Sequence, residues 1–237
     1  MGSLDALLTV QDLDTRTDQL RHRRETLPER GELAAAQRSV KETEELADVA
    51  RTRLRELKAS EKALEDEAAT VEAHAADIQR KMYDGSITAA KELEAFQTDH
   101  EHLKKRQVEL EDRAIEILEA AEPIEAELAA LTARVEAATA SVIEIDERLV
   151  VAEAEIDAEV EQIRSERAAA ADEVPPAVLS AYEPMRLKLG GVGAARLAGN
   201  RCEGCHLQIP SAELEGIRHA ADDALVTCPE CGRLLVR

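Results

Sequence analysis

Apolar residues recur every seven positions through most of this chain. The first position of each heptad from Leu93 to Ile163 and the fourth position from Phe96 to Ala152 are apolar, and only His100 and Gln107 interrupt this pattern. A seam sustained over so many heptads is typical of a coiled-coil helix. We therefore expect one helix from about residue 88 to residue 172.

A second seam of the same kind runs from Leu33 to Ile78, and the turn-forming sequence Asp84-Gly85-Ser86 separates the two. In an antiparallel hairpin the numbers of facing core residues have a constant sum. Whole-heptad pairing gives a sum of 171 for Ile78 with Leu93, and this places the fold-back between Gly85 and Ser86. The seams thus predict an antiparallel hairpin that turns near residues 82–87.

The first 27 residues carry a third seam, which faces the end of the long helix with a sum of 169 rather than 171. The first arm must therefore accommodate two extra residues between Leu27 and Leu33. Pro28 and Gly31 can break a helix, so we expect the first arm to be interrupted near residues 28–31. The predicted hairpin domain spans residues 1–173.

After the hairpin, Pro175 and Pro176 should end the long helix. A short amphipathic helix and a glycine-rich joint at residues 190–193, which we expect to be flexible, make 174–193 a linker. Residues 194–237 should hold a helix capped by Ser211 and short strands at 225–227 and 234–236. The expected fold is mainly α, a long antiparallel coiled-coil hairpin followed by a small ribbon.

Composition agrees with an elongated helical protein. The 237 residues include 50 Asp and Glu against 30 Lys and Arg, for a formal charge of −20, and only three aromatic residues. A thick enzyme core normally uses many more aromatic side chains. We find no apolar run of the roughly 18 residues that span a bilayer, and no secretory signal, so we expect a cytoplasmic protein that does not enter the membrane.

The four cysteines carry the clearest chemistry. Cys202 and Cys205 form one C-x-x-C knuckle, Cys228 and Cys231 form a second, and 22 residues lie between the two knuckles. Two such knuckles supply a closed tetrahedral shell of four thiolates, which suits one structural Zn²⁺ and leaves no position for a catalytic water. We expect Gly204 and Gly232 to provide the backbone angles that the knuckles need.

Other interpretations of the cysteines remain open from the sequence. Two disulfides require an oxidising compartment. The string from Cys202 to His206 also matches the C-x-x-C-H motif of haem c attachment, which would leave the second knuckle unexplained. An S₄ site can hold iron, and His206 could replace one cysteine as a ligand.

Three stretches carry a family resemblance: the N-terminal LLTVQDLDTRTDQLRHRRETLPERGEL, the hairpin turn MYDGSITAAKELEAFQTDHEHLKK, and the C-terminal GNRCEGCHLQIPSAELEGIRHAADDALVTCPECGRLLVR. Together they resemble the bacterial C4-type zinc-ribbon family with an N-terminal antiparallel coiled-coil hairpin. Ala90 stands where members often have Pro. The resemblance implies a non-enzymatic protein, with roles in nucleic-acid binding or as a partner of regulatory proteins.

Two surfaces are candidates for such contacts. The tip residues proposed to bind a partner are Tyr83, Gly85, Lys91, Glu92, Phe96, Gln97, Lys104 and Lys105. The ribbon residues proposed to bind nucleic acid are Arg196, Arg201, Arg218 and Arg233. Residues 190–237 carry five Arg and six acids, and residues 109–172 carry five Arg and 19 acids. Phosphate binding gains its affinity from Lys and Arg, so most of this surface should repel nucleic acid.

We therefore predict a non-enzymatic adaptor that presents a structural zinc ribbon and a specific hairpin tip to protein partners. The alternative is a regulator that binds RNA or DNA through the ribbon and tip, and a metal-dependent enzyme is a third hypothesis. We expect a monomer or weak homodimer without a small-molecule substrate, because helix faces offer no concave pocket.

Overall fold

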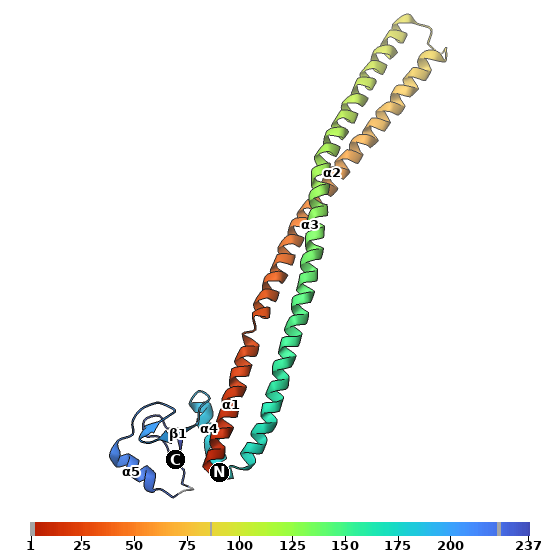
Figure 1. The fold of residues 1–237 in the computed structure, drawn as a ribbon. Helices are drawn as coiled ribbons and strands as arrows, with labels where there is room; N and C mark the ends of the chain where they lie inside the picture. Colours follow the sequence, from red (N-terminus) through yellow and green to blue (C-terminus); the bar gives the residue numbers. More distant parts are fainter. Residues whose placement is uncertain (1–2, 86, 222–223) are drawn as a thin grey trace. The chain divides into compact units, whose positions relative to one another are not determined.

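The computed structural model describes residues 3–85, 87–221 and 224–237. Most of the chain is helical, and three short strands lie near its C-terminal end (Figure 1). The elements in chain order are α1 (Ser3–Glu25), α2 (Pro28–Tyr83), α3 (Ala90–Asp172), α4 (Pro176–Lys188), β1 (Ala194–Ala198), β2 (Arg201–Cys202), α5 (Ser211–His219) and β3 (Leu234–Val236). Within the described residues, no helix has an apolar stretch long enough to cross a bilayer.

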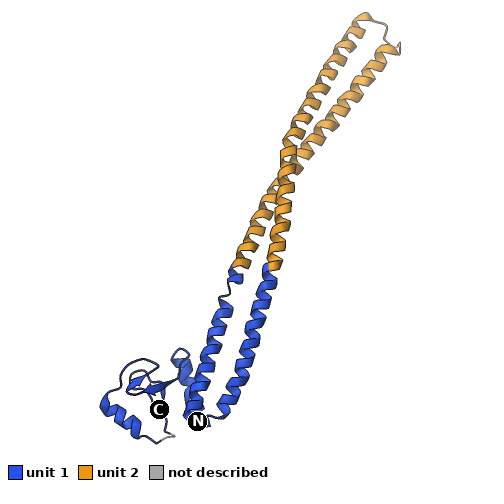
Figure 2. Cartoon of the chain, viewed as in Figure 1, with its two compact units in different colours: residues 1–31, 145–237 blue, residues 32–144 orange. Residues whose placement is uncertain are grey.

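The chain forms two compact units, residues 1–31 with 145–237 (unit 1) and residues 32–144 (unit 2) (Figure 2). Unit 2 is an antiparallel hairpin of α2 and α3. Its seam residues are buried or half-buried and the positions between them are exposed. One core cluster joins Ala47 and Ala50 of α2 to Ile124 and Leu131 of α3. The predicted coiled-coil hairpin is confirmed, because the heptad seams are the faces that the two helices bury.

Ion pairs also cross this hairpin. Lys58 contacts Glu125, and the Arg106 guanidinium donates to Glu67 at 2.8 Å. All four side chains are well exposed, so solvent screens each pair and its contribution to stability is small. The apolar seam therefore accounts for most of the stability of unit 2.

The turn of the hairpin lies between the end of α2 at Tyr83 and the start of α3 at Ala90. Gly85 has a φ of 80°, a left-handed conformation that glycine adopts without steric cost. The predicted fold-back centre between Gly85 and Ser86 falls partly outside the described residues, because Ser86 is not among them.

The first arm is interrupted at Thr26 and Leu27, between α1 and α2. Pro28 is the first residue of α2 and Gly31 lies inside that helix, so the break precedes the predicted segment at 28–31. Proline disfavours helical geometry in the residue before it, here Leu27, yet is well suited to the first turn of a new helix. The His22 carbonyl near the end of α1 accepts from both the Thr26 amide at 3.0 Å and the Thr26 hydroxyl at 2.8 Å.

Unit 1 packs α1 against the end of α3, against α4 and against the strands. Pro175 and Pro176 end the long helix as predicted, and α4 starts at Pro176. The core of this unit contains Leu7 and Val10 of α1, Tyr182 of α4, and Leu234 and Val236 of β3. The ribbon and the base of the hairpin consequently share one apolar core.

The strands form a three-stranded sheet in the order β2-β1-β3, with β1 antiparallel to β2 and parallel to β3. The strand predicted at 225–227 is not formed. Thr227 makes only an isolated bridge to Leu234, and the Leu235 amide donates to Val226 at 2.8 Å. Ser211 is the first residue of α5 rather than its cap, and Pro210 precedes the helix without a side-chain hydrogen bond.

Candidate metal centre and the polar network of unit 1

The two knuckles have the same local backbone geometry. In each, the amide four residues after the first cysteine donates to that cysteine's carbonyl, His206 to Cys202 and Gly232 to Cys228, both at 2.8 Å. Amides inside each knuckle also hydrogen-bond the sulfur of its first cysteine. Each short turn therefore directs two sulfurs toward the same point and places backbone N–H donors next to the sulfur of its first cysteine.

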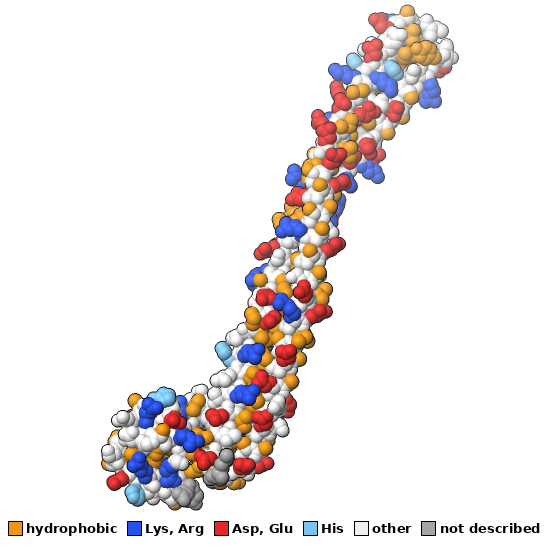
Figure 3. All heavy atoms as spheres, in the orientation of Figure 1, with side chains coloured by type: hydrophobic (Ala, Val, Ile, Leu, Met, Phe, Trp, Pro, Cys, Tyr) orange, Lys and Arg blue, Asp and Glu red, His pale blue; other side chains and the backbone are white. Residues whose placement is uncertain are grey.

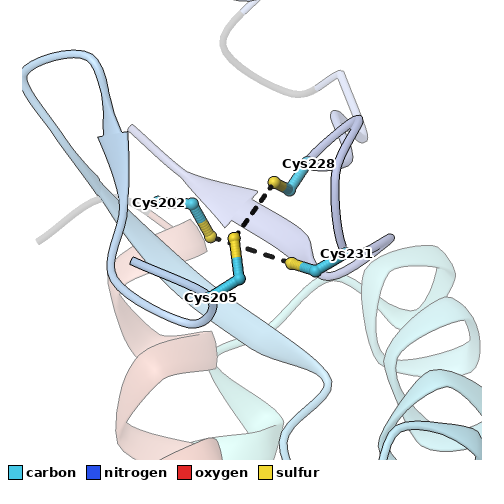
Figure 4. A group of neighbouring side chains, drawn as sticks. All are labelled: Cys202, Cys205, Cys228 and Cys231. Carbon is cyan, nitrogen blue, oxygen red and sulfur yellow. Dashed lines mark hydrogen bonds between the residues drawn. The ribbon is translucent and has the colours of Figure 1, made fainter. Parts of the chain in front are cut away.

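The four sulfurs point toward one another from two separate turns (Figure 4). The Sγ atoms of Cys202 and Cys231 are 3.9 Å apart, as are those of Cys205 and Cys228. All four lie within 4.8 Å of one another. A tetrahedral Zn²⁺ with Zn–S bonds of about 2.3 Å separates its sulfurs by about 3.8 Å. The donor set therefore fits one structural Zn²⁺, which all four cysteines would hold.

The thiols differ in their affinity for protons. Burial raises the pKa of Cys202, and it raises that of Cys228 to about 12. Burial also acts on Cys231, but hydrogen bonds from Arg233 and from neighbouring cysteines outweigh it and lower the pKa to about 7. Arg233 thus stabilises the Cys231 thiolate. A bound divalent cation favours the thiolate form of all four ligands.

Only one of the two knuckle glycines has the predicted backbone role. Gly232 has a φ of 73°, as expected, whereas Gly204 does not adopt a positive φ. A Cβ on Gly204 would lie 2.6 Å from Cδ of Arg233 and 2.9 Å from Cβ of Ala195. Gly204 is therefore required for close packing. The left-handed residue of the first knuckle is His206, with a φ of 60°, at the position equivalent to Gly232.

We expect Gly204→Ala to destabilise the ribbon by about 1–3 kcal/mol, because the added methyl overpacks the site against β1 and Arg233. Gly216→Ala is the matched control. Gly216 lies in α5, where an added Cβ would meet nothing within 4 Å, so the helix should gain about 0.5–1 kcal/mol. Thermal unfolding and the rate of zinc transfer to a chelator measure both effects. Equal behaviour of the two variants would refute the packing role.

The ribbon arginines proposed to bind nucleic acid are only partly available. Arg218 donates to the Gly199 carbonyl and Arg233 to the Val192 carbonyl, each at 3.0 Å. Arg196 lies 3.8 Å from Asp5, and Arg201 is exposed on β2. Acidic side chains lie among the basic ones on the face drawn in Figure 3. The ribbon offers scattered cations rather than a continuous basic surface.

The residues proposed for the tip separate into two groups. Tyr83, Gly85, Lys91 and Glu92 flank the turn and are exposed. Phe96 is half-buried in the seam, with exposed Gln97 beside it. Lys104 and Lys105 follow Lys91 by about 20 Å along α3 at 1.5 Å per residue, so they lie away from the tip. Tyr83 is 80% exposed at the end of α2.

A buried polar network in unit 1 was not predicted from the sequence. The Asp14 carboxylate, 4% exposed, accepts hydrogen bonds from Arg167 at 2.6 and 3.1 Å and from the Tyr182 hydroxyl at 2.8 Å. Arg186 lies 3.5 Å from Asp14 and donates to Asp18 at 2.6 Å. Burial and then the Asp14 hydrogen bond raise the pKa of Tyr182. This network fastens α4 to α1 and α3.

Gln11 holds the joint that leads into the ribbon. Its side-chain oxygen accepts from the amides of Gly193 at 2.7 Å and Ala194 at 3.2 Å, while its nitrogen donates to the Gly191 carbonyl at 2.9 Å. The joint predicted to be flexible is therefore hydrogen-bonded to α1. The sequence offered one signal of the Asp14 network. Tyr182 is one of only three aromatic residues, and a buried tyrosine hydroxyl needs a hydrogen-bond partner.

The fold and the cysteine site define a coiled-coil hairpin protein that ends in a C4-type zinc ribbon. The chain belongs to the family described as CT398-like coiled coil hairpin domain, which matches residues 10–190, and residues 201–235 match the C4-type zinc ribbon domain. The bacterial family expected from the sequence is confirmed.

Relatives of this chain share both parts. An uncharacterized protein of Mycobacterium tuberculosis is 32% identical over 98% of this chain and 94% of its own length. A solved structure from Mycobacterium smegmatis is 29% identical, with a TM-score of 0.86 over 99% of this chain and 97% of that one. CT398 from Chlamydia trachomatis, 19% identical, shares the fold with a TM-score of 0.72 over 98% and 96% of the two chains.

Proposed function

We propose that this protein is a non-enzymatic cytoplasmic adaptor that binds a protein partner through the tip of its hairpin. The family and the fold support an adaptor-like role, because they combine a helical hairpin with a closed metal shell. Four thiolates around one Zn²⁺ leave no open coordination position for a reacting group. The zinc therefore has a structural role in the ribbon, and the protein acts by binding a partner rather than by catalysis.

The exposure of Tyr83 is the observation that carries this proposal. The chain has two tyrosines, and Tyr182 is fully buried while Tyr83 is 80% exposed at the end of α2. Tyrosine is enriched among the residues that dominate binding energy at protein interfaces. Apolar side chains gather at this end of unit 2 (Figure 3). An exposed aromatic residue beside a turn fits a contact with a protein.

The tip is less suited to nucleic acid. Arg80 donates to Asp77 at 3.0 Å and Lys81 lies 2.9 Å from the same carboxylate. Further along α3, away from the tip, Arg106 is paired with Glu67. Phosphate contacts would have to replace these intramolecular pairs in a chain whose formal charge is −20. For this reason we favour a protein partner over RNA or DNA.

The test places a photo-activatable benzoylphenylalanine at position 83 or, as a control, at Val49, which is 67% exposed on the same helix. We expect position 83 to cross-link a defined protein in bacterial cells while position 49 does not. An excess of the unlabelled chain should compete, and a Tyr83→Ala chain should compete at least tenfold less well. Identical products from both positions, or cross-links to RNA alone, would contradict the proposal. Thermal stability of Tyr83→Ala should change by less than about 0.5 kcal/mol.

A further inference from the structure

A cavity of about 570 Å³ lies among α1, α3 and α4 of unit 1. No concave pocket is expected from the sequence, because a simple hairpin does not place α4 beside the other helices. The volume is in the range of small-molecule sites. The residues that line it are Asp14, Thr17, Arg21, Val160, Glu161, Arg164, Arg167, Ala168, Glu183 and Arg186.

Two of the four arginines are fixed at the inner wall. Arg167 binds both oxygens of Asp14 and also donates to Glu183 at 2.5 Å. The side chain of Arg186 is only 14% exposed, and its buried Nε forms an ion pair with Asp14 at 3.5 Å but has no hydrogen-bond partner. A buried donor that makes no hydrogen bond is energetically unfavourable. The inner wall therefore holds two fixed guanidinium groups, one of which has a donor that makes no hydrogen bond.

The other two arginines lie at the rim and are weakly held. Arg21 is 64% exposed and 3.6 Å from Asp18, and Arg164 is 77% exposed and 3.6 Å from Glu161. Each of these contacts is an exposed i,i+3 pair on a single helix and adds little to stability. Both guanidinium groups can turn toward the cavity at little energetic cost.

We propose that this cavity binds a small phosphate-bearing anion. Arginines approach it from three helices, Arg21 from α1, Arg164 and Arg167 from α3, and Arg186 from α4. Guanidinium donors converging from several directions suit a tetrahedral phosphate, whose oxygens point in several directions, better than a planar carboxylate.

The carboxylates around the cavity do not oppose such a ligand strongly. Asp14 is already bound by Arg167 and Tyr182, and Glu183 is bound by Arg167. Glu161 loses only an exposed pair when Arg164 turns away. The ligand would join α1, α3 and α4, and so stabilise the base of the hairpin. This ligand site is separate from the partner contact proposed for the tip.

Calorimetry and thermal unfolding of the full zinc-loaded chain test the proposal, with inorganic phosphate and pyrophosphate as probes at constant ionic strength set by chloride. The double variant Arg21→Gln with Arg164→Gln removes the rim cations. The control, Arg113→Gln with Arg134→Gln, removes the same charge from exposed positions of α3 in unit 2. We expect saturable binding that weakens at least tenfold in the rim variant and less than twofold in the control.

Three outcomes would overturn the proposal. They are no saturable binding of either probe, equal weakening in the two double variants, and tighter binding of citrate than of both phosphate probes. Without saturable binding there is no anion site. Equal weakening in the two double variants would mean that the anions bind by general charge attraction, and tighter binding of citrate would mean that the cavity prefers carboxylates. Because all four substituted arginines are exposed, circular dichroism should show the same helix content in each variant.

Discussion

Removal of zinc is expected to unfold the ribbon and loosen α1, while unit 2 stays helical. The strands of the ribbon have only five, two and three residues, too few to hold the fold without the metal. Structural zinc in small domains contributes about 10–16 kcal/mol of binding free energy at neutral pH. The loss reaches α1 because Leu7 and Val10 share a core with Leu234 and Val236.

Hydrogen exchange with and without a strong chelator measures this effect. Amides of residues 194–237 and of the first turns of α1 should lose protection, whereas those of α2 and α3 within residues 32–144 should keep it. Cys228→Ser should reproduce the result in the presence of zinc, and Thr227→Ser, an exposed neighbour, should not. A ribbon that stays protected without metal would show that packing alone sustains it.

Replacement of Asp14 by Ala is expected to destabilise unit 1 by about 3–5 kcal/mol. The change removes the carboxylate that Arg167 and Tyr182 bind, and it leaves buried donors without an acceptor. Breaking one side of a buried charged pair costs this much because the remaining charge stays buried. Tyr182→Phe removes a single hydroxyl, so its cost should be about 1–1.5 kcal/mol.

Thermal and denaturant unfolding followed by circular dichroism provide the measurement. Asp12→Ala is the control, since Asp12 lies on α1 two residues away and is exposed; we expect its effect to stay within about 0.5 kcal/mol. If Asp14→Ala were as mild as the control, the network would contribute geometry without stability. The raised pKa of Tyr182 also predicts how the stability of unit 1 depends on pH. The stability that the protonated Tyr182 contributes is present below the ordinary tyrosine pKa of 10.0 and is lost as the pH rises above it.

Periodicity and spacing predicted the parts of this protein that depend on local rules. The heptad seams identified which faces of α2 and α3 are buried, since a seven-residue repeat keeps one stripe on the same side of a helix. The cysteine spacing predicted the ligand set, because each knuckle is a local turn. Pro28 predicted an interruption of the first arm near residues 28–31. The interruption lies at Thr26 and Leu27 instead, because proline restricts the backbone of the residue before it.

Features that depend on tertiary packing were not predicted. Asp14 and Gln11 lie in a segment that looks like one arm of a hairpin, yet α1 also contacts α4 and the ribbon. Nothing local indicates that Arg167 lies near Asp14, 153 positions away in sequence. The role of Gly204 was misassigned for the same reason, because its constraint comes from Arg233 and Ala195 and not from its own backbone angles.

The core that joins Leu7 to Val236 also has a consequence for the order of folding during synthesis. Residues 32–144 are all available early, so unit 2 can pair its helices while translation continues. Unit 1 needs β3, which follows every other element in the chain. Until then the apolar side of α1 has no complete partner, and during translation the N-terminal segment must remain soluble without its native core.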